Sequence, residues 1–95
     1  MSFQNDVVRL AGGPVSFYEE YTTTNLYVER TFGGDIHTIT VSNDSTTDDV
    51  QLSFNGSALA AELNPSETIT LNTKSRTSVY VKGTAGSGTV RLWGW

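Results

Sequence analysis

The segment VQLSF-NG-SALAAEL, residues 50–63, constrains this chain most, because apolar and polar residues alternate on both sides of Asn55-Gly56. A two-residue type I′ turn needs positive φ at both central positions, and Asn-Gly adopts it readily. A turn of this length sets Leu52 opposite Leu59, so the apolar side chains share one face. The other pairs on that face are then Phe54 with Ser57 and Val50 with Ala61. The segment predicts a β-hairpin.

A second pair of alternating runs closes the chain. In SVYVKG-TAGS-GTVRLWGW, residues 78–95, a small glycine-containing stretch separates the two runs. With Thr84–Ser87 as the loop, we expect a second hairpin with one apolar face. The pairs on that face are Val81 with Val90 and Val79 with Leu92.

Two further runs in the C-terminal two thirds indicate strands. DIHTITVSND (35–44) alternates with His37, Ile39 and Val41 on one face, and ETITLN (67–72) repeats the pattern. About five strands at a spacing of roughly 8–12 residues are typical of a sandwich or barrel. We therefore predict an all-β fold, an antiparallel β-sandwich or jelly-roll-like small domain.

The first third of the chain is less regular. Short strand-like runs occur at 7–10, 15–21 and 25–32, and glycine pairs interrupt them. We therefore expect an irregular N-terminal segment, residues 1–34, followed by a compact antiparallel β domain, residues 35–95. No stretch has a convincing helical period.

Size and composition point toward association. The 95 residues are enough for one domain with a modest core. The apolar share of 37% lies below the usual level of about 45–50%. There is no cysteine, so disulfides cannot compensate, and subunit contact is the other common way to stabilise a small domain. We expect a homo-oligomer. The fourteen threonines suit a pleated, half-exposed sheet.

The charge disfavours two classes of partner. The net charge is −4 and only six cations are spread along the chain, so no basic stripe exists for nucleic-acid phosphates or an anionic membrane. No apolar run approaches the roughly 18 residues of a membrane span, and the first residues lack a signal-peptide pattern. We expect synthesis in the cytoplasm and no nucleic-acid or membrane binding.

Histidine and aspartate offer the first candidates for chemistry. His37 is the only histidine and has no motif around it, so a structural or partly buried role is favoured. Asp44, Asp48 and Asp49 share one loop, but the turn glycine and terminal glutamate of a calcium loop are missing. A solvated hairpin loop is favoured there, with a weak metal site left open.

Glutamates and the glycine-rich loop offer no better site. Glu19-Glu20 and Glu62 with Glu67 are pairs that any acidic chain contains, and nothing fixes their separation. GTAGSG (83–88) lacks the Lys-Ser/Thr of a phosphate loop and precedes a strand rather than a helix. We predict no catalytic residue, no cofactor and no metal, and a protein that is not an enzyme.

The C-terminal run also carries the residue types that dominate interfaces. In the predicted register Arg76, Tyr80, Arg91, Trp93 and Trp95 lie along one face, where Arg91 can form a cation–π contact with Tyr80 or Trp93. Three interpretations stay open: a second face of the core, a subunit interface, or an aromatic platform for a sugar ring. Aromatic residues of the first third are further candidate contacts, namely Tyr18, Tyr27 and Phe32.

Short motifs from Ile36 to Trp95 resemble those of small bacteriophage virion proteins. They are SND (42–44), FNG (54–56), LNPSE (63–67), VYVKG (79–83) and RLWGW (91–95). The resemblance covers about sixty residues and excludes residues 1–34. It consists of turns and terminal aromatics rather than a catalytic signature.

The resemblance implies a role in the virion. Such proteins are capsid decoration or cement proteins, or small neck and tail components. A decoration protein implies a closed oligomer such as a trimer, with the major capsid protein as partner and the first third lying as an arm along a neighbour. The alternative function, from another class, is a carbohydrate- or receptor-binding module of a phage tail or fibre that uses the C-terminal aromatics.

Overall fold

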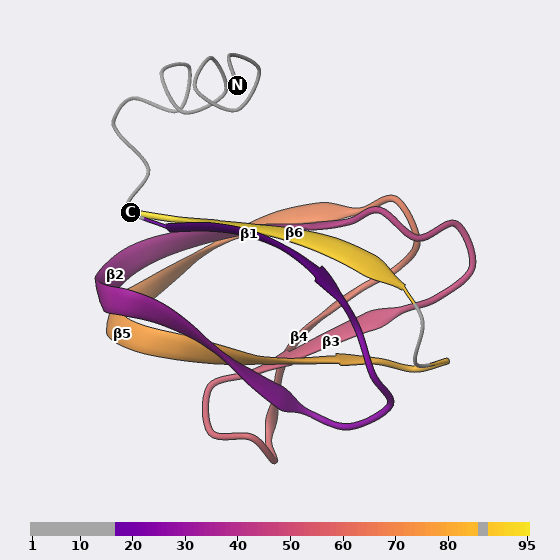
Figure 1. Cartoon of the computed structure of the whole chain (residues 1–95), viewed down its shortest axis with the longest axis horizontal. Helices are drawn as coiled ribbons and strands as arrows, with labels where there is room; N and C mark the ends of the chain where they lie inside the picture. Colours follow the sequence, from indigo (N-terminus) through magenta and orange to yellow (C-terminus); the bar gives the residue numbers. More distant parts are fainter. Residues whose placement is uncertain (1–16, 86–87) are drawn as a thin grey trace.

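The computed structural model describes residues 17–85 and 88–95, and they form six antiparallel β-strands (Figure 1). The strands are β1 (Phe17–Thr22), β2 (Val28–Asn43), β3 (Val50–Ser53), β4 (Leu59–Leu63), β5 (Thr68–Gly83) and β6 (Thr89–Gly94). These ranges contain no helix, which confirms the all-β prediction. Accordingly, no helix in the described part of the chain is long and apolar enough to cross a membrane.

The strand order is β1-β6-β2-β5-β3-β4, and the two long strands fold this ladder into two layers. β2 and β5 pair over 28–31 with 78–81 and again over 38–42 with 68–72, with an irregular stretch between. β6 bonds only the later half of β2, and β3 bonds only the later half of β5.

We call the layer with β1 and β6 the first layer and the layer with β3 and β4 the second layer (Figure 1). Long strands shared by two layers define a jelly-roll-like sandwich, which confirms the predicted class.

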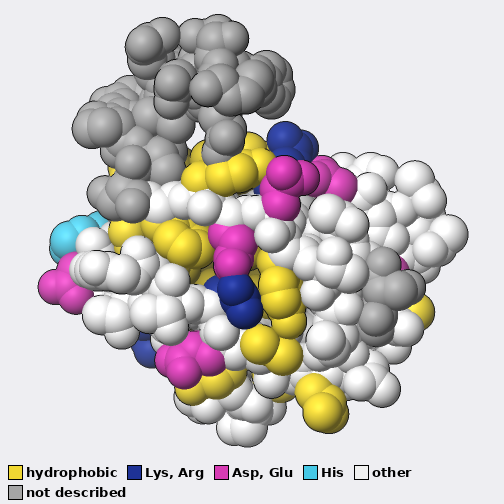
Figure 2. All heavy atoms as spheres, viewed as in Figure 1, with side chains coloured by type: hydrophobic (Ala, Val, Ile, Leu, Met, Phe, Trp, Pro, Cys, Tyr) yellow, Lys and Arg dark blue, Asp and Glu magenta, His cyan; other side chains and the backbone are white. Residues whose placement is uncertain are grey.

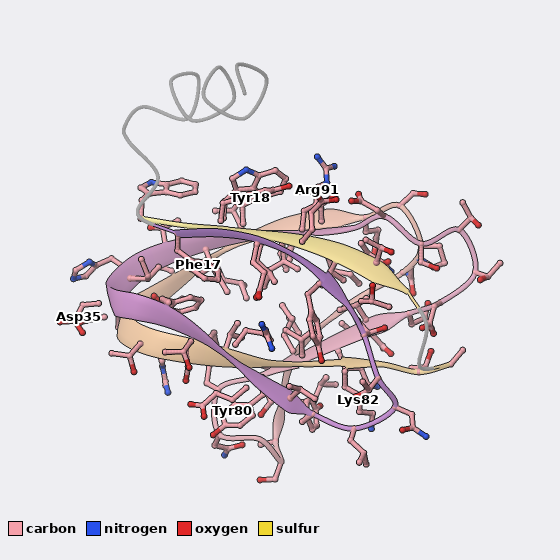
Figure 3. The ribbon with its side chains drawn as sticks, in the orientation of Figure 1. Phe17, Tyr18, Asp35, Tyr80, Lys82 and Arg91 are labelled. Atoms are coloured by element: carbon pink, nitrogen blue, oxygen red, sulfur yellow. The ribbon has the colours of Figure 1, made fainter. Side chains whose placement is uncertain are left out.

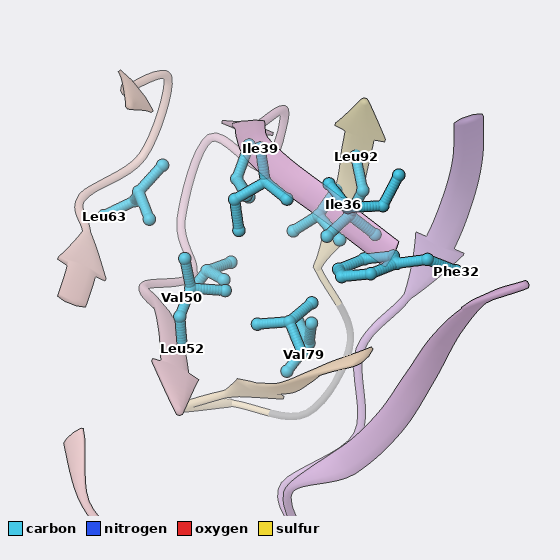
Figure 4. Packing of buried hydrophobic residues seen from close by; sticks show 11 residues of the cluster. Phe32, Ile36, Ile39, Val50, Leu52, Leu63, Val79 and Leu92 are labelled. Atoms are coloured by element: carbon cyan, nitrogen blue, oxygen red, sulfur yellow. The ribbon is translucent and has the colours of Figure 1, made fainter. Parts of the chain in front are cut away.

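The core lies between the layers, where alternate side chains of both meet (Figure 4). Its buried members are Phe32, Ile36, Ile39, Val41, Val50, Leu52, Leu63, Val79, Val81, Val90 and Leu92.

A bulge in β2 alters the predicted alternation of this strand. The backbone N–H groups of His37 and Thr38 both donate to the carbonyl of Trp95, each at 3.0 Å, so two residues oppose one. Ile36 and Ile39, three positions apart, consequently both face the core. His37 is turned to solvent. The expectation of a structural or partly buried histidine on the Ile39 face was wrong, because the extra residue reverses the side of the strand.

The hairpin of β3 and β4 is confirmed, but its two-residue turn is wrong. Leu52 pairs with Ala61 and not with Leu59, and the loop is longer. Gly56 has a φ of 86°, whereas Asn55 has no positive φ. Asn55 Oδ1 instead accepts bonds from two backbone N–H groups farther along the loop, at 2.9 and 2.8 Å. Side-chain capping of the backbone has displaced the type I′ turn.

The predicted pairing of β5 with β6 is also wrong, because β2 lies between these strands. The inward direction of the apolar side chains is nevertheless right: Val79, Val81, Val90 and Leu92 are at most 1% exposed. They meet across the core from different layers rather than side by side. Alternation sets which way a side chain points, and it does not choose the neighbouring strand.

Part of the predicted N-terminal segment belongs to the same sheet. β1 pairs with β6 along its whole length, and β2 runs through the predicted boundary between residues 34 and 35. Gly33, with a φ of 81°, lies within this continuous strand. The boundary therefore does not divide the described sheet, because long-range pairing recruits 17–34. Residues 1–16 of the arm predicted over 1–34 lie outside the described residues.

Candidate interaction faces

The five C-terminal candidates do not form one surface. Tyr80 projects from the outer side of the second layer, while Arg91 projects from the outer side of the first, beside Tyr18 (Figure 3). The correction follows from the strand order, since β5 and β6 are not neighbours. We call the residues around Arg91 on the first layer the β6 face; they are Tyr18, Asp44, Arg91 and Trp93. We call the residues around Tyr80 on the second layer the β5 face; they are Tyr27, Phe54, Arg76, Tyr80 and Lys82.

The remaining two candidates lie elsewhere. Phe32 is in the core at 6% exposure, with its ring edge-on to Phe17 at a centroid separation of 5.1 Å. Trp95 is half-buried, and its backbone is tied to Thr38 by hydrogen bonds in both directions, each of 3.0 Å. The last residue is therefore docked within its own subunit through its backbone.

On the β6 face, an ion pair fixes the cation. Arg91 Nε lies 2.6 Å from Asp44 Oδ2, and Arg91 Nη2 lies 3.1 Å from Asp44 Oδ1. This two-point contact is the geometry that a planar guanidinium favours. The hydrogen bond that Arg91 donates to Asp44 raises the pKa of Arg91 above its ordinary value. The guanidinium also lies 5.0 Å from the Trp93 ring centroid, which confirms one of the two predicted cation–π contacts.

Aromatic rings complete the β6 face. Tyr18 and Trp93 lie on paired strands, with ring centroids 5.5 Å apart and planes at 56°. Burial, followed by the nearby charge of Glu20, raises the pKa of the Tyr18 phenol above 10.0. Trp93 is only 7% exposed although it points away from the core, and its Nε1 hydrogen finds no acceptor in the described structure. A buried donor without a partner costs about 1–3 kcal/mol.

The β5 face is more open. The guanidinium of Arg76 lies 4.7 Å from the Phe54 ring centroid, and no carboxylate pairs with it among residues 17–85 and 88–95. The ammonium of Lys82 lies 5.2 Å from the ring centroid of Tyr27. Tyr80 is half-buried against the β3–β4 loop, where a Cβ at Gly56 would stand 3.2 Å from its ring. Both cations of this face contact aromatic rings, and neither forms an ion pair with a carboxylate of residues 17–85 and 88–95.

Sequence reasoning missed an ion pair at the seam between β1 and the first half of β2. Arg30 Nε lies 2.8 Å from Glu19 Oε1, and a second bond joins Arg30 Nη2 to Glu19 Oε2. Glu19 opposes buried Leu92, so it faces inward, whereas Glu20 faces outward. The pair considered as carboxylates for catalysis is therefore split between two sides of one strand. Figure 2 shows charged side chains set among hydrophobic ones on this side.

The aspartate loop is built into the fold. Asp48 is 2% exposed, and its Oδ1 accepts bonds from Thr84 Oγ1 at 2.7 Å and the Ala85 N–H at 2.6 Å. Asn43 Nδ2 donates to the Asp48 carbonyl at 2.8 Å. The predicted solvated loop is thus wrong for Asp48, whose buried carboxylate joins two loops through these hydrogen bonds. The described residues contain no group of three or more His, Cys, Asp or Glu placed to hold a metal.

Comparison with known proteins supports the fold alone. No family model and no curated protein sequence matches the chain. Among solved structures, a de novo designed double-stranded β-helix aligns with a TM-score of 0.56 and 12% identity, covering 82% of this chain and 97% of that one. The SPBc2 prophage-derived protein YomS aligns with a TM-score of 0.50 and 17% identity, covering 81% and 91%.

An enzyme is also among the similar structures. Hydroxypropylphosphonic acid epoxidase from S. wedmorenis aligns with a TM-score of 0.53 and 8% identity, covering 82% of this chain and 41% of the epoxidase. Such low identities establish shared architecture and leave activity open. The class that fold and comparisons define together is a small jelly-roll-like domain of the double-stranded β-helix type.

Proposed function

We propose that this chain is a non-enzymatic virion structural protein, a capsid decoration or cement protein that binds the major capsid protein through the β6 face. The observation that carries the proposal is the unpaired Nε1 hydrogen of Trp93 within the Tyr18, Arg91 and Trp93 cluster. Buried donors are normally satisfied. This one is enclosed within its own subunit, so an acceptor from another molecule reaches it only when the side chains that cover it shift on docking. In this proposal a backbone carbonyl of the capsid protein is that acceptor.

The residue types of the β6 face support this role. Tyrosine, tryptophan and arginine are the residues that carry most binding energy at interfaces. Arg91 is already held by Asp44, so little side-chain freedom is lost when a partner docks. The structural likeness to a prophage-derived protein agrees with a phage origin, at the level of architecture.

A non-enzymatic role is supported by how the acidic side chains are used. Glu19 and Asp44 are held in ion pairs, and Asp48 is bonded to two loops. His37 is exposed and lies at the bulge in the middle of β2, whereas Asp44 directly follows the end of this strand. Within the described residues these groups stabilise the sheet and its loops.

The test is co-sedimentation with capsid shells assembled from the major capsid protein of the phage whose genome carries this gene. We expect wild-type protein to bind in a fixed stoichiometry. Trp93→Phe keeps a ring but removes the N–H, so affinity should fall up to roughly tenfold, as expected for one hydrogen bond. Arg76→Ala, on the β5 face, is the control and should bind as wild type.

Two results would overturn the proposal. Wild-type protein that stays in the supernatant excludes the cement role. Equal losses for Trp93→Phe and Arg76→Ala would exclude the β6 face as the contact. Circular dichroism of both variants establishes that each is folded.

A further inference from the structure

The loop between β3 and β4 holds two neighbours that can react with each other, Asn55 and Gly56 (Figure 1). An asparagine amide loses ammonia when the backbone nitrogen of the next residue attacks its Cγ and closes a succinimide ring. Glycine has no Cβ to hinder this attack, and the other five asparagines of the chain precede different residues. The Asn55 side chain is exposed, so water reaches the amide and ammonia can leave.

The hydroxyl of Ser53 connects the two reacting groups. The Gly56 N–H donates to Ser53 Oγ at 3.0 Å, and Ser53 Oγ in turn donates to Asn55 Oδ1, also at 3.0 Å. The nitrogen that must lose a proton and the oxygen that must gain one are thus joined by one side chain. Ser53 is 0% exposed and pairs with both Leu59 and Tyr80, so the sheet fixes its position.

Further donors surround the amide oxygen, where negative charge develops during the attack. Asn55 Oδ1 accepts from the backbone N–H groups of Ser57 and Ala58, at 2.9 and 2.8 Å, and from Ser57 Oγ at 3.3 Å. Donors aimed at a developing oxyanion stabilise the transition state of acyl transfer. Asn55 Nδ2, the leaving group, donates no hydrogen bond within residues 17–85 and 88–95. Asn43 Nδ2, by contrast, is held by three carbonyls.

We propose that Asn55 is a self-catalysed deamidation site, in which Ser53 relays the proton of the Gly56 nitrogen to Asn55 Oδ1. The Gly56 nitrogen bonds to Asn55 Cγ while its proton passes to Ser53 Oγ, and Ser53 gives its own hydroxyl proton to Oδ1. The Cγ–Nδ2 bond then breaks, the proton on Oδ1 passes to Nδ2, and ammonia leaves. Water opens the succinimide to aspartate or isoaspartate, and Ser53 ends unchanged.

The product places a new negative charge beside the β5 face. Residue 55 follows Phe54, whose carbonyl accepts a hydrogen bond from Arg76 at 3.5 Å and whose ring lies 4.7 Å from the same guanidinium. The Tyr80 ring also borders this loop at Gly56. Deamidation therefore changes the charge next to an arginine of the second layer. The inference does not rest on the proposed function, because the β6 face lies on the first layer.

Time courses of the full chain at neutral pH, folded in buffer and unfolded in guanidinium chloride, test the inference. Mass spectrometry measures the replacement of the amide –NH2 by –OH, and fragmentation locates it. Folded wild-type protein should convert Asn55 at least about tenfold faster than the unfolded chain, because unfolding removes the relay. The folded rate should also rise less steeply with pH, since Ser53 replaces hydroxide as the proton acceptor.

Two variants separate the relay from a general effect of loop capping. Ser53→Ala removes the relay, so the folded variant should convert Asn55 no faster than the unfolded wild-type chain and with its steeper pH dependence. Ser45→Ala is the matched control, because Ser45 Oγ likewise accepts from two backbone N–H groups, in another loop. It should convert Asn55 at the wild-type rate. Circular dichroism establishes that both variants are folded.

Folded wild-type protein that converts Asn55 no faster than the unfolded chain would exclude catalysis by the fold. A folded Ser53→Ala variant with the wild-type rate, or a Ser45→Ala variant slowed as much as Ser53→Ala, would exclude the relay. If Ser53→Ala does not fold, the folded and unfolded wild-type rates and their pH profiles decide the question. A protein that converts Asn55 as expected yet fails to bind capsid shells would reject only the proposed function.

Discussion

The β6 face and the β5 face use the same residue types in different ways. Both place an arginine over an aromatic ring, at 5.0 Å for Arg91 on Trp93 and 4.7 Å for Arg76 on Phe54. Arg91 is also bonded to Asp44, and Trp93 is nearly buried. Arg76 is exposed, and its one further contact within the described part of the chain is a 3.5 Å hydrogen bond to the Phe54 carbonyl. Burial and counter-charge, rather than composition, therefore distinguish a face built into the fold from an open one.

The largest expected difference between the faces is in stability. Trp93→Ala removes a nearly buried ring and should lower the free energy of unfolding by about 3 kcal/mol. Tyr80→Ala on the β5 face removes a half-buried ring and should cost less than half as much. Chemical denaturation of both variants measures the two losses. Equal losses would mean that the two faces contribute alike to the fold.

A smaller effect is expected where the β5 face meets the β3–β4 loop. Gly56→Ala places a Cβ at a φ of 86° and 3.2 Å from the Tyr80 ring, so unfolding should become easier by about 1–2 kcal/mol. Gly34→Ala is the control, because a Cβ there meets nothing within 4 Å and its φ is not positive. Thermal unfolding compares them. A Gly34 variant as destabilised as the Gly56 variant would contradict a local cause.

The smallest effect concerns pH and sharpens the description of the β6 face. Burial raises the pKa of Tyr18 above 10.0, so the folded state favours the neutral phenol. That contribution to stability is fully present below pH 10.0 and is lost as pH rises from there through the folded pKa. Ultraviolet titration of wild type minus Tyr18→Phe measures this one phenol. A difference midpoint at or below 10.0 would contradict the assignment.

Local sequence patterns correctly predicted where most strands lie, but they did not predict which strands pair with each other. The alternation in 78–95 correctly placed Val79, Val81, Val90 and Leu92 toward the core. It could not reveal that β2 separates β5 from β6, because the same four side chains would face inward in a hairpin or across a sandwich. This error assembled five aromatic and cationic residues on one face, whereas the structure places two on the β5 face, two on the β6 face and Trp95 on neither.

Two features of the candidate sites had no usable local signal. The ion pair of Glu19 with Arg30 joins β1 to the first half of β2, and no sequence pattern near either residue predicts it. The burial of Asp48 depends on bonds to Thr84 and Ala85, more than thirty residues away. The resemblance to virion proteins likewise rests on turns, and it stays a prediction about function.

The sequence by itself determined that the chain is an antiparallel β protein and which side chains of most strands face inward. Both follow from residue volume, branching and a period of two, which are properties of a strand before it meets a neighbour. The tertiary structure alone decided which strands pair, where β2 carries its bulge, and which strands lie at the ends of the ladder. Those choices depend on contacts between residues far apart in the chain, so no window of sequence contains the energies that settle them.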